Sequence, residues 1–201
     1  MNRFLTELLL FFPVFVVSIT CHEFAHAWVA TRFGDPTPRL AGRLTLNPLR
    51  HLDLMGTLLL FIVHFGWAKP VPVDPGNLAR PRLQMPLIAA AGPLANLGLA
   101  LFGVLLFAMI RPGEGSMAAA VLVTLVWLNV ALMLFNLLPL PPLDGSNALR
   151  SLLPAGMLES YDRLAPFGVV LVFAIFMLPG VSGAFSRLVW GVLQALFGLA
   201  L

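Results

Sequence analysis

The chain has 201 residues, of which 59% are hydrophobic and 10% are charged, and its mean hydropathy is +0.93. Soluble domains are about 45–50% apolar and about 25% charged, so the composition excludes both a soluble globular domain and a disordered chain. The net charge of +3 comes from 12 Lys and Arg against 9 Asp and Glu. These basic residues lie beside apolar runs, which favours membrane orientation over nucleic-acid binding.

The first apolar run covers residues 4–20, and its apolar character continues through Trp28 to Phe33. A signal peptide also has an apolar core, usually of about 7–15 residues, and Ala25-His26-Ala27 resembles its cleavage site. Only Arg3 precedes the run, however, and the whole segment is long enough to cross a hydrocarbon core of roughly 30 Å. We therefore predict a retained transmembrane span.

Four further apolar stretches follow, at residues 85–110, 117–138, 164–178 and 183–201. Turn-forming residues separate them at 111–115, 139–145 and 178–180. Another apolar piece, at 54–67, is several residues too short for a perpendicular span. The sequence thus predicts an all-α polytopic membrane protein with about five to six transmembrane helices in a single domain over residues 1–201.

The basic residues indicate whether the short piece at 54–67 crosses the membrane. If it crosses, six basic residues lie on each side, which is unusual for a membrane protein. If it enters and returns, three lie on one face and nine on the other, and the nine are Arg32, Arg39, Arg43, Arg50, Lys69, Arg80, Arg82, Arg150 and Arg163. The positive-inside rule then places these nine in the cytoplasm.

The segment between the first and second core helices, residues 34–82, is therefore predicted to be cytoplasmic and partly inserted in the membrane. Residues 44–46 and 71–73 are short pieces bounded by Pro and Gly, which could be strands of a small membrane-associated sheet. Non-helical backbone at membrane depth persists only where it is buried in protein or lines a water-filled cavity. A polar cavity is expected nearby.

The sharpest chemical signal is His22-Glu23-Phe24-Ala25-His26 on the first predicted helix. A spacing of four residues brings the two imidazoles to one face, one turn apart, so both can reach one zinc ion at about 2.0–2.1 Å. Glu23 lies beside them, where it can accept a proton from water at the metal. Ionisable residues in a membrane helix are costly and usually functional, although a polar cluster at a helix end is the simpler alternative.

A catalytic zinc usually takes three protein ligands. The lone cysteine, Cys21, excludes a thiolate cage, so the third ligand must be His or a carboxylate. His51 is expected in a solvated loop, and His64 is expected to be a hydrogen-bonded polar residue. The stronger candidate is Asp144, the only acidic residue between positions 114 and 159.

The topology also bears on the choice of Asp144. If residues 54–67 do not cross, the first span carries His22 and His26 in its inner half. Residues 85–110 then run outward and residues 117–138 run inward, which brings Asp144 to the same inner side. If residues 54–67 cross, Asp144 emerges on the opposite face. The assumption that residues 54–67 do not cross therefore explains both the unequal distribution of basic residues and the convergence of the three candidate ligands.

Three motifs resemble the site-2 protease family of intramembrane zinc metalloproteases, in its compact form without an inserted PDZ domain. They are His22-Glu23-x-x-His26, the Gly-Pro-Leu-Ala-Asn sequence at 92–96, and Asn-x-x-Pro-x-Pro-x-Leu-Asp-Gly at 136–145. Residues 39–48 and 66–73 also look like the compact branch. The resemblance covers most of residues 1–150, so we expect the catalytic core there and accessory helices at about 160–201.

The resemblance implies three ligands for one zinc ion per chain, namely His22, His26 and Asp144. It implies Glu23 as the general base. Two family asparagines that are thought to assist substrate positioning or the oxyanion match Asn96 and Asn136. An amide at either position could instead satisfy backbone groups freed by Pro93 or Pro139.

The function that the resemblance implies is cleavage of a transmembrane helix of a single-span membrane protein. The enzyme would lie in the cell membrane with its site toward the cytoplasm, with the lipid bilayer and the substrate as partners and no nucleic acid. Residues 68–73 could receive an unwound substrate segment by edge addition, although Pro70 and Pro72 each lack a backbone donor. The alternative is a non-catalytic metal-binding scaffold or transporter, but transport favours polar groups spread over several spans.

Overall fold

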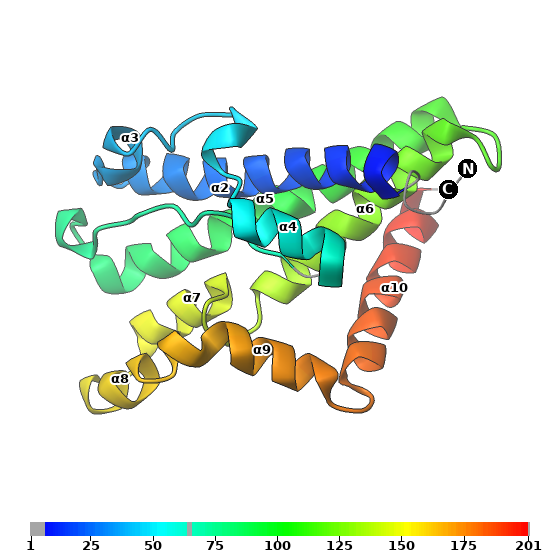
Figure 1. The fold of residues 1–201 in the computed structure, drawn as a ribbon. Helices are drawn as coiled ribbons and strands as arrows, with labels where there is room; N and C mark the ends of the chain where they lie inside the picture. Colours follow the sequence, from blue (N-terminus) through cyan, green and yellow to red (C-terminus); the bar gives the residue numbers. More distant parts are fainter. Residues whose placement is uncertain (1–6, 64–65, 201) are drawn as a thin grey trace.

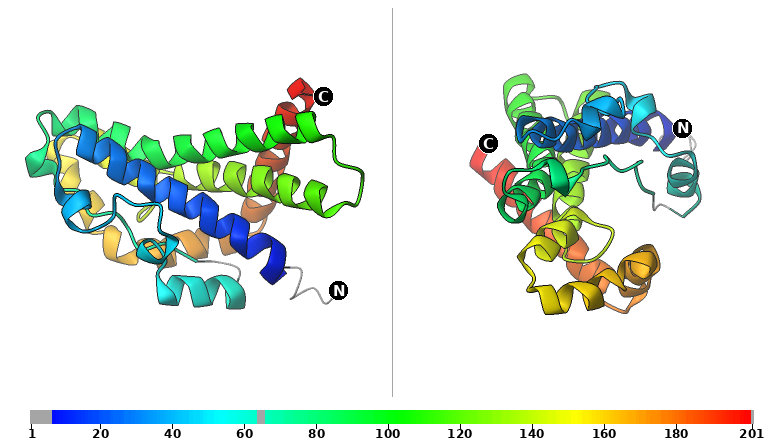
Figure 2. Two further views of the ribbon diagram at one scale, coloured as in Figure 1. Left: turned by 90° about the horizontal axis from the view of Figure 1, so that it is seen from above. Right: turned by 90° about the vertical axis from the view of Figure 1, so that its left-hand side faces the viewer.

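The computed structural model describes residues 7–63 and 66–200. Three long helices form its centre: α2 (Phe12–Arg32), α5 (Pro81–Ile110) and α6 (Met117–Asn136). Figures 1 and 2 show α5 and α6 side by side, with α2 crossing them. The shorter elements are η1 (Glu7–Phe11), α3 (Thr37–Leu40), η2 (Pro48–Arg50), α4 (Leu54–Val63), η3 (Pro75–Asn77), α7 (Asp144–Leu152), α8 (Ala155–Asp162), η4 (Ala165–Phe167), α9 (Gly168–Met177) and α10 (Val181–Ala200).

The hairpin of α5 and α6 is set by its turn residues. The α5 helix ends at Ile110: the N–H of Arg111 still donates to the carbonyl of Phe107, and the left-handed backbone of Arg111 then turns the chain out of the helix. The α6 helix begins after Ser116, whose hydroxyl accepts a hydrogen bond from the N–H of Ala119. The two helices approach closely at Gly103, where a Cβ atom would lie 2.9 Å from Cγ2 of Val126.

Four segments of the described chain are long and apolar enough to cross a membrane: Leu9–Arg32, Pro81–Ile110, Met117–Asn136 and Gly156–Met177. Large apolar side chains on the outer surface of α5, including Leu94, Leu101 and Leu105, are exposed, as expected of a lipid-facing surface. The predicted all-α fold is therefore confirmed, with four candidate membrane spans among the described residues. The predicted count of about five to six spans is not, because α10 is not among these four segments.

The core lies where these helices meet. Buried residues of α5, α6 and α10 form one cluster around Val104, Val126 and Val189. A second cluster joins α2, α4 and α6 around Phe15, Leu60 and Leu128. Lipid tails are as apolar as these side chains, so close van der Waals packing rather than removal from water holds α4 against the first half of α2.

The segment between α2 and α5 turns back on itself. Leu52 and Ala68 form an isolated antiparallel bridge, and the N–H of Lys69 donates to the carbonyl of His51 at 2.8 Å. Between them, α4 has only ten residues, about 15 Å of helix. The two ends of the segment therefore meet at one place, and α4 lies beside α2 (Figure 1). Residues 64 and 65, and with them His64, lie outside the described residues.

The two predicted strands are not formed in this segment. The backbone bends at 44–45, and residues 71–73 have no regular secondary structure. Pro70 and Pro72 have no N–H to donate, and no strand among the described residues lies beside them to pair with. In place of the expected sheet, this segment has the isolated bridge between Leu52 and Ala68.

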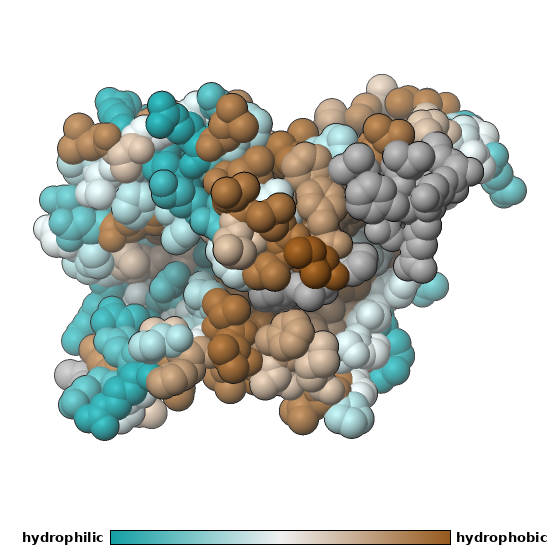
Figure 3. All heavy atoms as spheres, in the orientation of Figure 1, coloured by the Kyte–Doolittle hydropathy of each residue, from teal (hydrophilic) through white to brown (hydrophobic). Residues whose placement is uncertain are grey.

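One end of the molecule is polar. It carries α3, the start of α5 and α8 (Figure 1), and hydrophilic residues gather over it in Figure 3. Asp35, at this end, is fully buried and accepts hydrogen bonds from the N–H and hydroxyl of Thr37, the N–H of Asp74 and the amide of Asn77. This carboxylate ties the end of α2 to the turn that leads into α5.

Candidate metal centre

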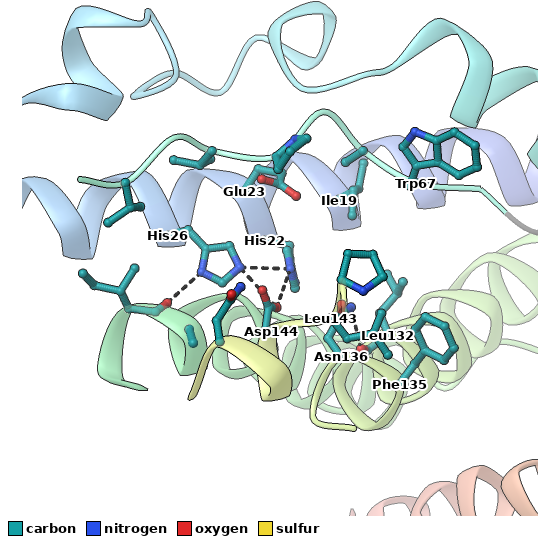
Figure 4. Close-up of a pocket in the computed structure, with 18 of the residues that line it drawn as sticks. Ile19, His22, Glu23, His26, Trp67, Leu132, Phe135, Asn136, Leu143 and Asp144 are labelled. Carbon is teal, nitrogen blue, oxygen red and sulfur yellow. Dashed lines mark hydrogen bonds and ion pairs between the residues drawn. The ribbon is translucent and has the colours of Figure 1, made fainter. Parts of the chain in front are cut away.

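Two histidines of α2 face the same point. His22 and His26 are one helical turn apart and only 3% and 7% exposed. Their Nε2 atoms lie 3.1 Å from each other, and the rings stand nearly perpendicular, at 81°. The spacing of four residues thus places both imidazoles on the face of α2 that packs against α5 and α7 (Figure 4).

Asp144, the first residue of α7, completes the group. Its Oδ2 atom lies 3.1 Å from Nε2 of His22 and 3.3 Å from Nε2 of His26. The turn between α6 and α7 is tight, because a Cβ atom at Gly145 would overlap the carbonyl oxygen of Leu137. This close approach brings the first residue of α7 under α2.

Nδ1 of each histidine, the ring nitrogen that points away from the shared site, forms a hydrogen bond with an oxygen of α5. Nδ1 of His26 lies 2.7 Å from the carbonyl oxygen of Ile88, and Nδ1 of His22 lies 2.7 Å from Oδ1 of Asn96. Because both oxygens are acceptors, each imidazole carries its proton on Nδ1. The lone pair of each Nε2 therefore points at the shared site, which is the arrangement found in metal-binding histidines.

The three converging atoms fit a zinc ion. Two imidazole lone pairs and a carboxylate oxygen are all acceptors, and Oδ2 of Asp144 is buried without a hydrogen bond. Ligands of a tetrahedral zinc at about 2.0–2.1 Å are about 3.3 Å apart, close to the 3.1–3.3 Å seen here. A Cβ atom at Gly92 of α5 would overlap Nε2 of His26, so the glycine leaves the room that the site needs.

Glu23 lies on another side of α2, facing the segment that carries Trp67 (Figure 4). It is 7% exposed and lines the same cavity as the three candidate ligands. Its Oε2 atom lies 4.0 Å from Nη2 of Arg43, and the same Nη2 donates to the carbonyl oxygen of Lys69. Burial lowers the pKa of Arg43 and the Glu23 carboxylate opposes this effect, but an arginine remains charged.

His51 corrects an expectation from the sequence. It was expected in a solvated loop but is fully buried. Its Nε2 donates to the carbonyl oxygen of Thr45 at 2.7 Å, and its Nδ1 lies 3.5 Å from Nη2 of Arg43. Residues 43–52 therefore fold over the Glu23 side of α2, and the histidine packs beneath them.

A cavity of about 570 Å³ opens beside the site. Its lining is apolar on most sides: Phe15, Ile19, Trp67, Val71, Leu132, Phe135 and Val172. Its polar side is formed by His22, Glu23, His26, Asn136, Asp144 and Asn147. The reactive groups therefore face an apolar chamber inside the helical bundle.

The two predicted asparagines lie in different settings. Asn136 lines the cavity, and its amide nitrogen donates to the carbonyl of Leu132 one turn earlier. Asn96 is fully buried, and its amide nitrogen donates to Oδ1 of Asn129 at 2.8 Å while its oxygen faces His22. The suggested role in substrate or oxyanion binding stays a prediction for both.

Sequence reasoning missed three residues around the site: Ser18, Arg43 and Asn129. Two of them carried a usable signal. Ser18 lies one turn before His22 on the same helical stripe, and Asn129 is an amide in the middle of an apolar helix, where polar groups are costly. Arg43 had no local signal, because only the folding of residues 43–52 over α2 brings it to Glu23.

The fold and the site together define a class of protein. A helical membrane protein that gathers two histidines and an aspartate at zinc-like separations, with the glutamate of an H-E-x-x-H motif in the same cavity, has the features of a membrane-embedded zinc metalloprotease.

Comparisons with known proteins support the assignment to this class. A family profile described as Peptidase family M50 matches residues 110–179. YwhC of Bacillus subtilis, named as a candidate zinc metalloprotease, is 41% identical over 97% of this chain and 92% of its own length. Rip2 of Mycobacterium tuberculosis, named likewise, is 33% identical over 92% of this chain and 71% of its own length. No solved structure gives a significant match.

The chain therefore belongs to peptidase family M50, the site-2 protease family, and is a zinc metalloprotease. Together with its four apolar segments, this makes it an integral membrane protein. The family resemblance predicted from the three motifs is confirmed.

Proposed function

We propose that this metalloprotease cleaves a transmembrane helix of a single-span membrane protein, near the cytoplasmic side of the cell membrane. The observation that carries the proposal is the position of the site within the apolar segment Leu9–Arg32. His26 and His22 lie about 9 Å and about 15 Å from the end of α2. A peptide bond that reaches this depth belongs to a chain that is itself in the bilayer.

The apolar cavity supports the same class of substrate. Phe15, Leu132 and Val172 line it and offer contacts to apolar side chains. A helical substrate hides its carbonyls in hydrogen bonds between residues four apart, so it must unwind locally before attack. The cavity holds enough volume for such a segment beside the site, about 570 Å³.

The chain's own residues supply the remaining chemistry. One zinc ion, held by His22, His26 and Asp144, would polarise the scissile carbonyl and lower the pKa of a water molecule. Glu23 accepts the proton from the attacking water and passes it to the leaving amine. Asn136 lines the same cavity and would donate to the developing oxyanion through the amide hydrogen that does not face the carbonyl of Leu132.

The distribution of charge supports the cytoplasmic side. If residues 54–67 enter and return, nine of the twelve basic residues share one side of the membrane with α3, the start of α5 and α7, among them Arg39, Arg80 and Arg150. The hydrophilic surface in Figure 3 lies over this end. By the positive-inside rule, this end faces the cytoplasm.

The central test compares the wild type with Glu23→Gln in detergent, by zinc content and by cleavage of a panel of single-span membrane proteins. We expect about one zinc per chain in both and a loss of about 10²–10⁴ in cleavage rate for the variant. Glu114→Gln, at the exposed turn between α5 and α6, is the matched control and should cleave like the wild type. Undiminished cleavage by Glu23→Gln, or cleavage of soluble unfolded chains only, overturns the proposal.

The side of the membrane has its own test. In a Cys21→Ser background, Leu40→Cys and Gly113→Cys place one thiol at each end of the molecule, where both positions are exposed. A membrane-impermeant maleimide applied to intact cells should label Gly113→Cys only, and both variants after lysis. The reverse pattern in intact cells contradicts the cytoplasmic placement.

A further inference from the structure

A chain of buried hydrogen bonds runs from His22 through three helices. Oδ1 of Asn96 lies 2.7 Å from Nδ1 of His22, and the amide nitrogen of Asn96 donates to Oδ1 of Asn129 at 2.8 Å. The amide nitrogen of Asn129 donates to the hydroxyl of Ser18 at 2.8 Å. Asn96, Asn129 and Ser18 are all fully buried. The path thus leaves α2, passes through α5 and α6, and returns to α2.

Two backbone carbonyls fix the direction of this chain. The hydroxyl of Ser18 donates to the carbonyl of Val14 at 2.8 Å, and the amide nitrogen of Asn129 also donates to the carbonyl of Leu125 at 2.9 Å. A carbonyl can only accept, so it determines which end of the Asn129 amide faces it. The oxygen of Asn129 must then face Asn96.

The orientation of the Asn129 amide determines, through Asn96, which ring nitrogen of His22 carries the proton. Because the oxygen of Asn129 faces Asn96, Asn96 must present its amide nitrogen there and its oxygen to His22. If the Asn96 amide were reversed, two oxygens would face each other and an NH₂ group would face Nδ1 of His22. The imidazole would then carry its proton on Nε2, which would block the lone pair that points at Asp144.

We propose that Asn96 and Asn129 are positioning residues that hold His22 in the one tautomer able to bind zinc. The inference rests on the proposed zinc site and adds to it a mechanism of assembly. His26 needs no such chain, because its Nδ1 faces the carbonyl of Ile88, which cannot be reversed. The two histidines are thus fixed by different means, one by backbone and one by side chains.

This role differs from the oxyanion role in what it predicts for Asn96. An oxyanion donor needs an N–H group, whereas positioning of His22 needs only an acceptor. Asn96→Asp keeps an acceptor toward His22 and removes the N–H donor, and its second oxygen, when protonated, can still donate to Oδ1 of Asn129. Asn96→Leu removes both functions. Positioning therefore predicts that Asn96→Asp binds zinc like the wild type and that Asn96→Leu does not.

The experiment measures zinc affinity in detergent, with zinc alone and a chromophoric chelator as competitor. Asn96→Leu should weaken zinc binding about 10–100-fold, and Asn129→Leu about tenfold. Thr20→Val is the matched control, since it removes a buried hydroxyl of α2 that has no hydrogen-bond partner among the described residues. Its zinc affinity should equal that of the wild type.

A double variant separates positioning from general damage to the fold. If Asn129 acts through Asn96, Asn129→Leu adds nothing to the loss already caused by Asn96→Leu, because the amide that it orients is gone. Additive losses, or wild-type affinity in Asn129→Leu, overturn the inference while leaving the zinc site intact. A folded wild type that binds no zinc overturns the proposed function and this inference together.

Discussion

Gly92 of α5 lies directly against the imidazole of His26, so close that a Cβ atom at position 92 would overlap Nε2 and also meet His22. Gly92→Ala should therefore push α5 away from α2 or turn the imidazole out of the site. We expect zinc affinity to fall at least tenfold, as it does when groups around a metal ligand are displaced. Zinc content and competition with a chelator measure the effect.

Gly98 provides the control for this change. It lies six residues further along α5, and a Cβ atom there would meet nothing within 4 Å. Gly98→Ala should keep full zinc binding and favour the helix by about 0.5–1 kcal/mol. Equal zinc affinity in Gly92→Ala and Gly98→Ala would show that the glycine does not serve the metal.

Removal of the metal should destabilise the fold around the site. Without a cation, two lone pairs and a carboxylate oxygen face one another at 3.1–3.3 Å. A ligand that binds only the folded state stabilises it by about 2.7 kcal/mol at one hundred times its Kd. A chelator should therefore lower the melting temperature of the wild type but leave that of Asp144→Asn unchanged.

Asp162→Asn is the matched control for Asp144→Asn in the chelator experiment. Asp162, on α8, is half-buried and pairs with Arg150 at 2.6 Å, away from the candidate ligands. Asp162→Asn should respond to the chelator as the wild type does. If Asp144→Asn also responds like the wild type, Asp144 is not a ligand.

Asp35 gives a prediction for pH. Burial raises the pKa of this carboxyl, but hydrogen bonds from Thr37, Asp74 and Asn77 outweigh burial and lower it below the usual 3.8. A group with a lowered pKa in the folded state stabilises the fold above its unfolded pKa, and this contribution is lost as the pH falls through the folded value. Asp35→Asn should thus cost about 1–3 kcal/mol at pH 7.

Melting temperatures measured from pH 7 downward test this sign. The gap between the wild type and Asp35→Asn should be constant down to about pH 5 and should shrink below about pH 4. A gap that widens on acidification would mean that the carboxylate does not stabilise the folded state.

Much of the metal centre could be predicted because its ligands are brought together by residue spacing on one helix and by the order of the membrane crossings. The spacing of His22 and His26 alone puts two imidazoles on one helical face. The proximity of Asp144 follows from counting crossings, once residues 54–67 are taken to return. The bridge between Leu52 and Ala68 brings the ends of that segment together, while its return within a membrane stays a prediction.

What could not be predicted depends on contacts between distant residues. The burial of His51 and the approach of Arg43 to Glu23 require residues 43–52 to fold over α2, and no periodicity in that loop indicates this. The predicted strands were wrong because short extended pieces form a sheet only where a partner edge exists. Val71 and its neighbours have no such edge beside them in the described chain.

The unpaired backbone of Val71 leads to the last prediction. Val71 and Val73 line the cavity, and the N–H of Val71 has no hydrogen-bond partner among the described residues. If an unwound substrate adds along residues 68–73, this N–H is the donor left between Pro70 and Pro72. Val71→Pro removes it and should lower kcat/KM about two- to tenfold, the worth of one backbone hydrogen bond, with zinc content unchanged. Val71→Ile, which keeps the N–H, should cleave like the wild type, and equal cleavage by both variants would rule out edge addition at this position.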